Sequence, residues 1–461
     1  MRTPDPLLPC EDELGLITDL YQLTMLAAYR EHRSGVRGAF ELWFRELPER
    51  RNFLLAAGLE PVLAYLLGLH FSEEQVTALR GVEAFRGLPE GFFADLRCFR
   101  FTGDVWAMRE GTPVFAEEPV LRVEAPIEQA QLVETYLLAA ISFGTLVASK
   151  AARVRLAAGD RTVVDFGSRR AHGPQAACWV ARSAYLAGMD GTSNVWAACR
   201  LGIPSWGTMA HSFVLAFPSE YEAFRAYSRT FPGRTVLLVD TFDTLEAVKR
   251  AAADPELSFL AIRLDSGEIV GLAKACRELL DGLDRPQVRI VASGDLDEDR
   301  IASILAAGAP IDSFGVGTRM VTSADAPALQ AVYKLVAVEE PGQPVRGVAK
   351  QSAGRRTVPG TKQVWRRRGA DGIMAEDMVT SLSETPPQGA WEPLLEPWIL
   401  GGRLCRAVPT LEECREYALQ QMRALPAELR AIETGRSHPV RVGSHQGESW
   451  RSHAGTDPAR R

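Results

Sequence analysis

The sequence predicts an α/β fold in which parallel strands alternate with helices around a barrel, with a β-rich unit beside it. Six short apolar runs end in Gly, Asp or His, and each is followed by a helix-compatible segment. The last four runs start 23, 29 and 23 residues apart, the length of a strand plus a crossover helix. Residues 99–125 instead hold β-prone runs separated by Gly and Pro. Six runs in a row favour a barrel over an open sheet, although their number alone is compatible with both.

The expected elements follow in chain order. Residues 16–29 have apolar side chains at helical spacing, and residues 39–44 are typical of a strand. Pro126 then opens a long, mostly apolar helix of about residues 128–157. The six apolar runs are 162–165, the stretch that enters Gly207, 236–240, 259–264, 288–292 and 311–315.

The C-terminal part completes this series. Residues 332–338 are strand-like, 339–397 hold short β patterns, and 411–432 are helical by composition. Few apolar residues follow position 435, so a disordered tail is expected there. The predicted segments are a β-rich part with a leading helix (1–125), an α/β barrel (126–339), a second β-rich part (340–405), a C-terminal helix (406–433) and a disordered tail (434–461).

Length and composition are those of a globular protein with a sizeable core. The 461 residues correspond to about three domains of roughly 150 residues, or to one large barrel with additions. Hydrophobic residues make up 46% and charged residues 24%, which excludes collagen-like, coiled-coil and wholly disordered chains.

The net charge disfavours nucleic acid as a partner. Lys and Arg number 52 against 58 Asp and Glu, so the formal charge is −6. Residues 434–461 carry five Arg against Glu448 and Asp457, which makes the remaining chain more acidic still. Such a body lacks the broad basic field that binds nucleic acid, so any anionic substrate must be held by local basic groups.

Cysteine usage and the apolar stretches indicate a cytoplasmic protein without a membrane span. Seven Cys residues in no CxxC spacing suggest neither a disulfide framework nor a zinc site. Residues 1–12 contain Asp5, Glu11 and Asp12 and no apolar run, unlike a signal peptide. The longest uncharged apolar stretch, 135–149, is shorter than the roughly 18 residues of a membrane helix. It is expected to be a buried helix.

Polar residues gather where the six runs end, and in a barrel they would converge on one mouth. Arg and Gly amides suit phosphate oxygens, Asp suits sugar hydroxyls or magnesium, and His suits proton or phosphoryl transfer. The pattern is typical of a site for a phosphorylated sugar. The clusters are 165–170, 207–212, Asp240 with Thr241, 263–267, 293–295 and 315–318.

Each cluster taken singly has a structural explanation. An Asp after a strand, such as Asp240 or Asp295, is most often a helix N-cap. The Gly315-x-Gly317 pair lacks the third Gly of a dinucleotide fingerprint, because Met320 stands there, and the chain has no Walker A motif. A lone His is more often a core residue than a catalyst. For His211, however, the strand-end position beside Ser212 favours a catalytic role.

Seven ordered blocks resemble nicotinate phosphoribosyltransferases. They are LITDLYQLTM (16–25), DFGSRRAHG (165–173), GTSNV (191–195), GTMAHSFV (207–214), RLDSG (263–267), 293–295 and 314–318. The resemblance implies an irregular (β/α) barrel of the type II phosphoribosyltransferase kind, with a β-rich domain built from both flanks. It further implies a cytoplasmic homodimer with shared active sites that works in NAD salvage.

The resemblance also implies the reaction. Phosphoribosyl is transferred from phosphoribosyl pyrophosphate to nicotinate with Mg²⁺, giving nicotinate mononucleotide and pyrophosphate. ATP hydrolysis is coupled to the transfer through a phosphorylated histidine, and the matching residue is His211.

Residue roles follow by position. Phe166 is expected to stack on the pyridine ring, opposite Tyr21 from the partner across a dimer interface. Arg169 would bind the carboxylate or phosphate of the substrates. Ser193 stands where related nicotinamide-using enzymes carry an Asp, and its hydroxyl can donate to a carboxylate that an Asp would repel.

Further positions concern the phosphoribosyl group. Arg263 and Asp265 resemble its contacts, Asp295 the ribose contact, and Gly317 with Thr318 the 5′-phosphate site. Three less specific candidates are Asp240 for magnesium and pyrophosphate, and Lys350 and Lys362 closing over phosphates.

The sequence is also compatible with other functions. The runner-up is a nicotinamide or quinolinate phosphoribosyltransferase. A barrel isomerase or aldolase acting on a sugar phosphate comes next, although a Schiff-base aldolase needs a strand Lys that the runs lack. A degenerate, non-enzymatic relative is disfavoured by the presence of Arg169, His211, Asp265 and Asp295.

Overall fold

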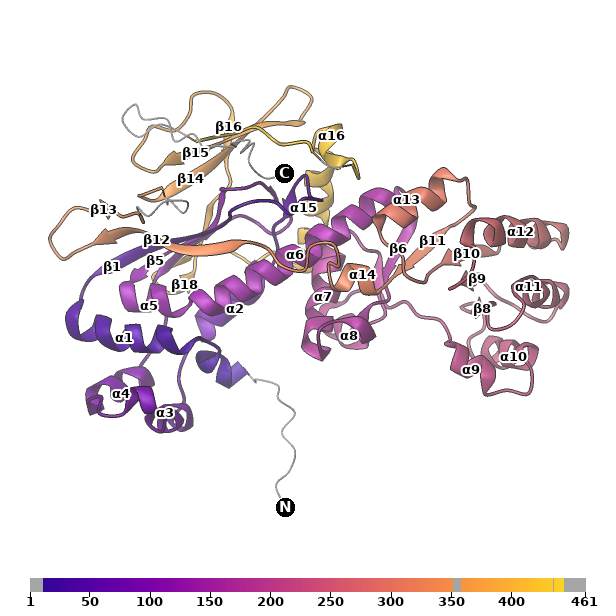
Figure 1. Ribbon diagram of the computed structural model, residues 1–461, viewed down its shortest axis with the longest axis horizontal. Helices are drawn as coiled ribbons and strands as arrows, with labels where there is room; N and C mark the ends of the chain where they lie inside the picture. The colour runs from indigo at the N-terminus through magenta and orange to yellow at the C-terminus, as the bar shows by residue number, and fades with distance from the viewer. Residues whose placement is uncertain (1–10, 351–357, 434, 443–461) are drawn as a thin grey trace, which may run out of the picture.

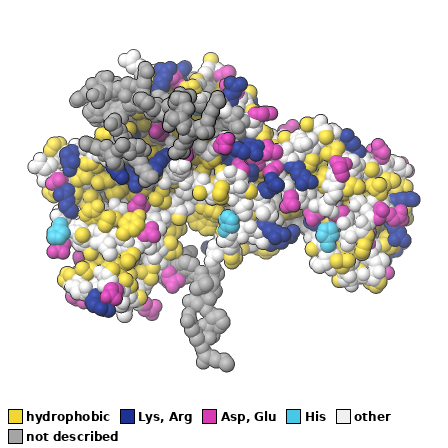
Figure 2. All heavy atoms as spheres, in the orientation of Figure 1, with side chains coloured by type: hydrophobic (Ala, Val, Ile, Leu, Met, Phe, Trp, Pro, Cys, Tyr) yellow, Lys and Arg dark blue, Asp and Glu magenta, His cyan; other side chains and the backbone are white. Residues whose placement is uncertain are grey.

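The structure is a computed structural model that describes residues 11–350, 358–433 and 435–442. Figure 1 shows two units joined by the long helix α6 (Glu134–Ala158). One unit is built on antiparallel sheets, and the other is a parallel sheet flanked by helices. On the face in Figure 2, basic and acidic side chains are intermixed.

The largest sheet is antiparallel and has the order β13-β12-β1-β5-β3-β17-β18. β1 lies between β5 and β12 and is buried along most of its length, as its apolar sequence predicts. The strands come from both flanks of the chain, which confirms the predicted β-rich unit. They are β1 (Arg37–Phe44), β3 (Asp104–Ala107), β5 (Pro119–Pro126), β12 (Ala331–Glu339), β13 (Arg346–Gly347), β17 (Glu396–Leu400) and β18 (Arg403–Leu404).

One strand lies outside the unit that the sequence predicts for it. β12 falls within the range 126–339 assigned to the barrel, yet it pairs with β1, from Arg37 opposite Glu339 to Phe44 opposite Ala331. Its apolar run correctly indicates a strand. Nothing in a single strand's sequence specifies whether its partner is a parallel neighbour or a distant antiparallel strand.

The second unit is built on a six-stranded sheet of order β7-β6-β11-β10-β9-β8, in which all pairings are parallel. Five of the six predicted apolar runs overlap its strands, and β7 lies in none of them. The strands are β6 (Thr162–Asp165), β7 (Gly191–Thr192), β8 (Val236–Leu238), β9 (Ala261–Leu264), β10 (Arg289–Ala292) and β11 (Ser313–Val316).

The predicted α/β class is confirmed, but over the described residues the ladder does not close into a barrel. β7 and β8 are its two edges. The run entering Gly207, expected to be a strand, contributes only an isolated bridge from Ser205 to Thr192. Pro204 lacks the amide donor that a longer ladder would need.

Helices pack around both sheets. The predicted helix of about 128–157 is α5 followed by α6, and the leading helix begins at Leu20 rather than at Leu16. Besides α6, the helices are α1 (Leu20–His32), α2 (Leu59–Gly68), α3 (Glu73–Arg80), α4 (Glu90–Arg97), α5 (Ile127–Leu132), α7 (Pro174–Leu186), α8 (Val195–Leu201), α9 (His211–Leu215), α10 (Glu220–Thr230), α11 (Thr244–Ala253), α12 (Ile269–Gly282), α13 (Glu298–Ala306), α14 (Thr318–Val321), α15 (Leu411–Arg423) and α16 (Ala427–Arg430). Short 3₁₀ turns are η1 (Glu11–Leu16), η2 (Glu83–Phe85) and η3 (Ser168–Arg170).

Helix α6 is the core helix between the two units. In the described part of the chain it alone is long and apolar enough to cross a membrane, but 78% of its apolar window is buried inside the protein. The apolar stretch 135–149 is therefore a buried helix, as the sequence predicts.

Two small sheets, of order β16-β14-β15-β19 and β2-β4, complete the β-rich unit. The first of them includes residues that the sequence assigns to a disordered tail. β19 extends from Val440 to Val442 and pairs with β15, while His438 is buried and stacks on Phe115 with ring centroids 4.2 Å apart. Residues 435–442 thus belong to the fold, although their composition resembles a solvated tail; the rest of the tail lies outside the described residues. The strands are β2 (Leu54–Leu55), β4 (Pro113–Val114), β14 (Lys362–Arg368), β15 (Met374–Ser381), β16 (Trp391–Pro393) and β19 (Val440–Val442).

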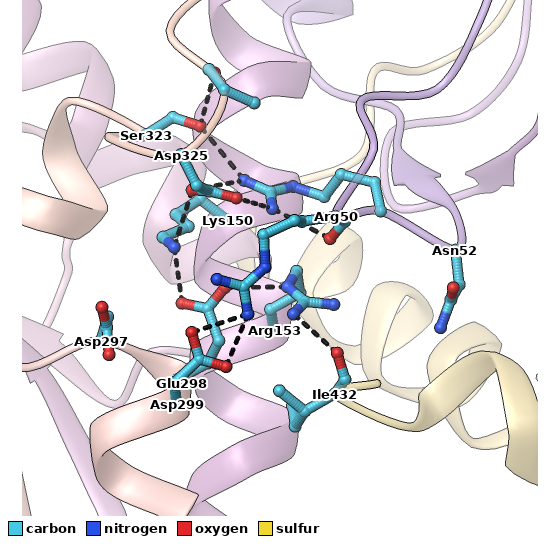
Figure 3. A network of polar contacts seen from close by, with 12 residues as sticks. Arg50, Asn52, Lys150, Arg153, Asp297, Glu298, Asp299, Ser323, Asp325 and Ile432 are labelled. Carbon is cyan, nitrogen blue, oxygen red and sulfur yellow. Dashed lines mark hydrogen bonds and ion pairs between the residues drawn. The ribbon is translucent and has the colours of Figure 1, made fainter. Parts of the chain in front are cut away.

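A buried ionic network fixes α6 to α13 (Figure 3). Lys150 Nζ lies 2.6 Å from Glu298 Oε2 and 2.8 Å from Asp325 Oδ1. Arg153 Nε donates to Glu298 Oε1 at 2.9 Å, and Arg51 pairs with Asp325. Burial alone would raise the pKa of Glu298, but Lys150 and Arg153 outweigh it and hold that pKa below its ordinary value. The carboxylate is therefore charged and neutralised at neutral pH.

Glu298→Gln is expected to lower the free energy of unfolding by about 3 kcal/mol, because it leaves two buried cations with too little compensating charge. Urea unfolding monitored by circular dichroism measures the loss. The matched control is Glu246→Gln, which breaks an exposed i,i+4 pair with Arg250 and should cost less than about 0.5 kcal/mol. Equal losses in the two variants would contradict a role for the network in stability.

Candidate active site

The carboxyl ends of the parallel strands bring the predicted polar residues together. In such a sheet these ends lie along one edge, where ligands usually bind. The Phe166 amide donates to Val316 O at 2.8 Å, and the Ser193 amide donates to Asp165 O at 2.8 Å. The Ser293 amide donates to Leu264 O, also at 2.8 Å. Hydrogen bonds thus connect the ends of neighbouring strands directly.

Asp165, the last residue of β6, stabilises the loop that follows this strand. Its carboxylate accepts hydrogen bonds from the Gly167 amide at 2.8 Å and the Thr192 hydroxyl at 2.7 Å, while burial raises its pKa. Gly315 leaves space for the half-buried ring of Phe166, since a Cβ there would come within 2.3 Å of the ring. The aromatic side chain expected to stack on the substrate is thereby fixed in place.

Asp265 lies at the centre of the cluster. Ser293 Oγ donates to its Oδ1 at 2.5 Å, and Asp240 Oδ2 accepts from its amide at 3.1 Å. The guanidinium of Arg263 and the Nε2 of His211 each lie 3.8 Å from its carboxylate oxygens. The ends of β8, β9 and β10 and the start of α9 therefore converge on Asp265.

Arg263 provides a cation with unused donor capacity. Its Nη1 donates to Thr208 Oγ1 at 2.5 Å, and its buried Nε has no hydrogen-bond partner among the described residues. Burial lowers the pKa of Arg263, opposed by the charges of Asp265 and Asp240, and the side chain remains protonated because an Arg pKa starts so high. A buried unpaired donor of this kind suits an anionic ligand.

His211 is oriented by its neighbours. It is the first residue of α9, its Nδ1 lies 3.1 Å from Thr241 Oγ1, and its side chain is 40% exposed. The hydroxyl on one ring nitrogen and the carboxylate of Asp265 near the other restrict the rotation of the ring.

Neither of the strand-end Asp residues is a helix N-cap. Asp243 caps α11 and Asp297 caps α13, each accepting from the amide three residues later. Asp240 instead accepts from Ser266 Oγ at 2.6 Å and has a buried Oδ1 without a partner among the described residues. Asp295 is exposed in the left-handed region, at φ 47°. Both carboxylates remain available for a ligand.

The residues present fit a magnesium ion that arrives with its substrate. In the described part of the chain, no group of three or more His, Cys, Asp or Glu side chains is arranged as a protein-only metal site. Magnesium commonly uses one or two carboxylates together with substrate phosphates. The unpartnered Oδ1 of Asp240 is a suitable single ligand of this kind.

The remaining predicted residues differ in their relation to this cluster. Gly317 precedes α14, and Thr318 is the first residue of that helix, with no side-chain cap among the described residues. Arg169 is exposed but close enough to Arg263 to lower its pKa. Tyr21 lies away from the cluster on α1, is 49% exposed, and donates to Glu134 Oε2 at 3.4 Å.

Neither candidate lysine joins the strand ends. Lys350 is exposed after β13. Lys362 is buried in the β-rich unit, where its Nζ pairs with the buried Glu41 at 2.7 Å and donates to Gly360 O at 2.7 Å. The structure contradicts the predicted closure of Lys362 over phosphates, because its charge neutralises a buried carboxylate.

Sequence reasoning gave no role to several residues of the cluster. Thr208, Thr241 and Ser293 orient Arg263, His211 and Asp265 respectively, and all three lie in the polar clusters at the strand ends. Their position was a usable signal, but hydroxyl residues are common in turns and name no chemistry by themselves. Glu220 was also missed; its Oε1 is buried without a described partner.

Glu220 should make stability depend on pH. Burial, with smaller contributions from Asp240 and Asp243, raises its pKa from 4.5 to about 7. The folded state then binds a proton that the unfolded chain releases, so the free energy of unfolding falls as pH rises through this window. Because about half of the residue is exposed to solvent, we expect the free energy of unfolding to fall by only about 1 kcal/mol.

Urea unfolding of the ligand-free protein at about pH 5 and about pH 8 measures this effect. Between these two pH values, the free energy of unfolding of Glu220→Gln should fall by about 1 kcal/mol less than that of the wild type, because the amide does not titrate. Glu222→Gln, on the same helix and exposed, is the control and should follow the wild type. Identical pH dependence in all three proteins would contradict the raised pKa.

Known proteins match nearly the whole chain. The family model described as nicotinate phosphoribosyltransferase (NAPRTase) N-terminal domain matches residues 16–142, and the NAPRTase family model matches residues 162–363. Nicotinate phosphoribosyltransferase pncB2 of Mycobacterium tuberculosis (strain ATCC 25618 / H37Rv) is 48% identical over 435 residues, covering 93% of this chain and 91% of that protein. The Bacillus subtilis nicotinate phosphoribosyltransferase is 43% identical, covering 77% and 74%.

A solved structure agrees with these sequence matches. The crystal structure of human nicotinic acid phosphoribosyltransferase has a TM-score of 0.79 at 29% identity, covering 92% of this chain and 97% of that chain. With this fold and with residues 16–142 and 162–363 matched, the chain belongs to the nicotinate phosphoribosyltransferase family.

Proposed function

We propose that this protein transfers phosphoribosyl from phosphoribosyl pyrophosphate to nicotinate, giving nicotinate mononucleotide and pyrophosphate in NAD salvage. The observation that carries the proposal is the convergence of Arg263, His211 and Asp240 on Asp265 at the carboxyl edge of the parallel sheet. The family to which the chain belongs supports it.

Positioning dominates the proposed chemistry. The bond from ribose C1 to pyrophosphate breaks, leaving an oxocarbenium-like sugar, and the lone pair of the pyridine nitrogen forms the new bond without a general base. Phe166 supports one face of the flat ring. Tyr21, exposed on α1 and distant from the cluster, would reach the other face from a second copy in a homodimer with shared sites.

The phosphoribosyl group is assigned to the remaining residues. Arg263 and Asp265 hold the sugar phosphate, Asp295 binds ribose hydroxyls, and the amides of Gly317 and Thr318 bind the 5′-phosphate. Arg169 is the exposed cation for a substrate carboxylate or phosphate. Magnesium, when bound through Asp240, would neutralise charge on the departing pyrophosphate.

ATP coupling is assigned to His211. Its imidazole attacks the γ-phosphorus of ATP, ADP leaves, and later hydrolysis of the phosphohistidine releases phosphate. The partly exposed ring beside Asp265 supports this role, because phosphorylation would add negative charge next to the substrate contacts. With this coupling the enzyme would be of the ATP-coupled ligase class. A cytoplasmic location is proposed separately, from its cysteine usage.

Ser193→Asp tests the choice of base. We expect kcat/KM for nicotinate to fall by about a hundredfold, because a second carboxylate would repel that of the substrate, while nicotinamide is affected far less. Initial rates of mononucleotide formation with each base give the ratio. Ser193→Ala is the control for losing the hydroxyl alone. An unchanged nicotinate to nicotinamide ratio in Ser193→Asp would remove the specificity argument.

A further inference from the structure

A polar cavity lies near the amino end of β6, away from the carboxyl ends of the parallel strands. It has a volume of about 410 Å³ and lies between the end of α6 and the helices α15 and α16. Thr162, the first residue of β6, lines it, whereas the cluster around Asp265 lies at the carboxyl ends of the strands. The cavity is therefore separate from the candidate active site. Its size is that of a small-molecule pocket.

Four arginines give the cavity a positive charge. Arg155 and Arg415 share Asp190, with nitrogen to oxygen distances of 3.0 and 3.1 Å, so that carboxylate is already neutralised. Burial lowers the pKa of Arg155, assisted by the neighbouring charge of Arg415. Asp160 is the other acidic side chain in the lining.

Arg423 and Arg430, the two arginines from the C-terminal helices, have side chains without a partner among the described residues. Arg423 ends α15 and Arg430 ends α16, and neither side chain forms an ion pair or hydrogen bond with any described residue. The Nε of Arg430 is buried without a hydrogen-bond partner in that same part of the chain. An unpaired guanidinium donor at the wall of a cavity is costly unless a ligand or water satisfies it.

The cavity also has an apolar wall, formed by Leu156, Leu419 and Met422. Gly188, in the left-handed region at φ 105°, allows the chain to pass close to this wall. A Cβ there would come within 2.9 Å of Leu419 Cδ2 and 3.0 Å of Arg155 Cγ. The lining therefore combines two free guanidinium groups with an apolar surface.

We propose that this cavity binds a nucleoside monophosphate or a phosphate ester of similar size. The phosphate would lie against Arg423 and Arg430, whose planar forks suit phosphate oxygens. The flat or apolar part would lie against Leu156, Leu419 and Met422. A cavity volume of about 410 Å³ is in the range of small-molecule pockets, so a small phosphate ester is the proposed occupant. The proposal does not depend on the reaction catalysed at the strand ends.

Calorimetric titration of the full-length protein with AMP tests this site, with adenosine and inorganic phosphate as partial ligands. We expect the Arg423→Ala/Arg430→Ala double variant to bind AMP at least tenfold more weakly than the wild type, a change of about 1.4 kcal/mol. Arg403→Ala removes an exposed arginine of β18 and should bind like the wild type. Asp265→Ala, altered at the strand ends, should keep the same AMP site.

Circular dichroism and the Tm of each variant establish that the fold is intact. Leu419→Ser should weaken AMP binding more than phosphate binding, because only AMP contacts the apolar wall. The proposal is overturned if the wild type does not bind AMP, or if AMP affinity is unchanged in the double variant. It is equally overturned if Asp265→Ala, rather than the arginine pair, removes the binding, since AMP would then occupy the strand ends.

Discussion

Replacing Asp265 with alanine is expected to lower kcat/KM for nicotinate mononucleotide formation by about a thousandfold. Its carboxylate lies 3.8 Å from both the Arg263 guanidinium and the His211 imidazole, and it accepts a 2.5 Å hydrogen bond from Ser293. Without it, the two cationic or ionisable groups lose their common orienting charge. Substrates would then be held in many geometries instead of one reactive geometry.

Asp265→Asn separates charge from shape in this prediction. The amide oxygen can still accept from Ser293, so a loss nearly as large as that of the alanine variant would assign the effect to the negative charge. Steady-state kinetics with both substrates varied gives the two values. Glu278→Ala, exposed on α12, is the control. Activity of Asp265→Ala within threefold of the wild type would contradict a central role.

His211→Ala is expected to abolish the stimulation of the reaction by ATP and to leave slow, ATP-independent transfer. The variant lacks the imidazole proposed to accept the phosphoryl group, while Arg263 and Asp265, the proposed contacts of phosphoribosyl pyrophosphate, are retained. The ratio of initial rates with and without ATP measures the coupling. Acid-labile protein-bound phosphate, followed from γ-labelled ATP, reports the intermediate itself.

His172→Ala is the matched control, because His172 is exposed and lies between η3 and α7, shortly after Arg169. This variant should keep both the stimulation and the labelled intermediate. Full ATP stimulation in His211→Ala would rule out the phosphohistidine, whatever the basal rate.

Local patterns predicted the strands well and their partners less well. The runs at 162–165, 288–292 and 311–315 overlap β6, β10 and β11, because a short run with β-branched or aromatic residues before a turn predicts a strand. Strand β12 was recognised but assigned to the wrong sheet, and the two-residue β7 is too short to leave a pattern. Sheet membership depends on contacts distant in sequence, which one sequence does not display.

In the candidate site, too, some residues could be predicted from local sequence and others could not. The proximity of Asp265, Arg263 and His211 was predictable, because polar residues that follow buried runs tend to gather at one edge of a parallel sheet. Lys362 was not, since its partner Glu41 is 321 residues away along the chain. The buried His438 was missed for the same reason: its stacking on Phe115 is invisible in a segment of polar composition.

Product formation from three competing bases tests the central claim most directly. Purified protein with phosphoribosyl pyrophosphate and magnesium is given nicotinate, nicotinamide or quinolinate, each with and without ATP, and the mononucleotide is identified by mass spectrometry. We predict nicotinate mononucleotide and pyrophosphate in equal amounts, formed faster with ATP, and little product from the other two bases. Absence of a mononucleotide from every base, or preferential use of nicotinamide or quinolinate, would contradict the account.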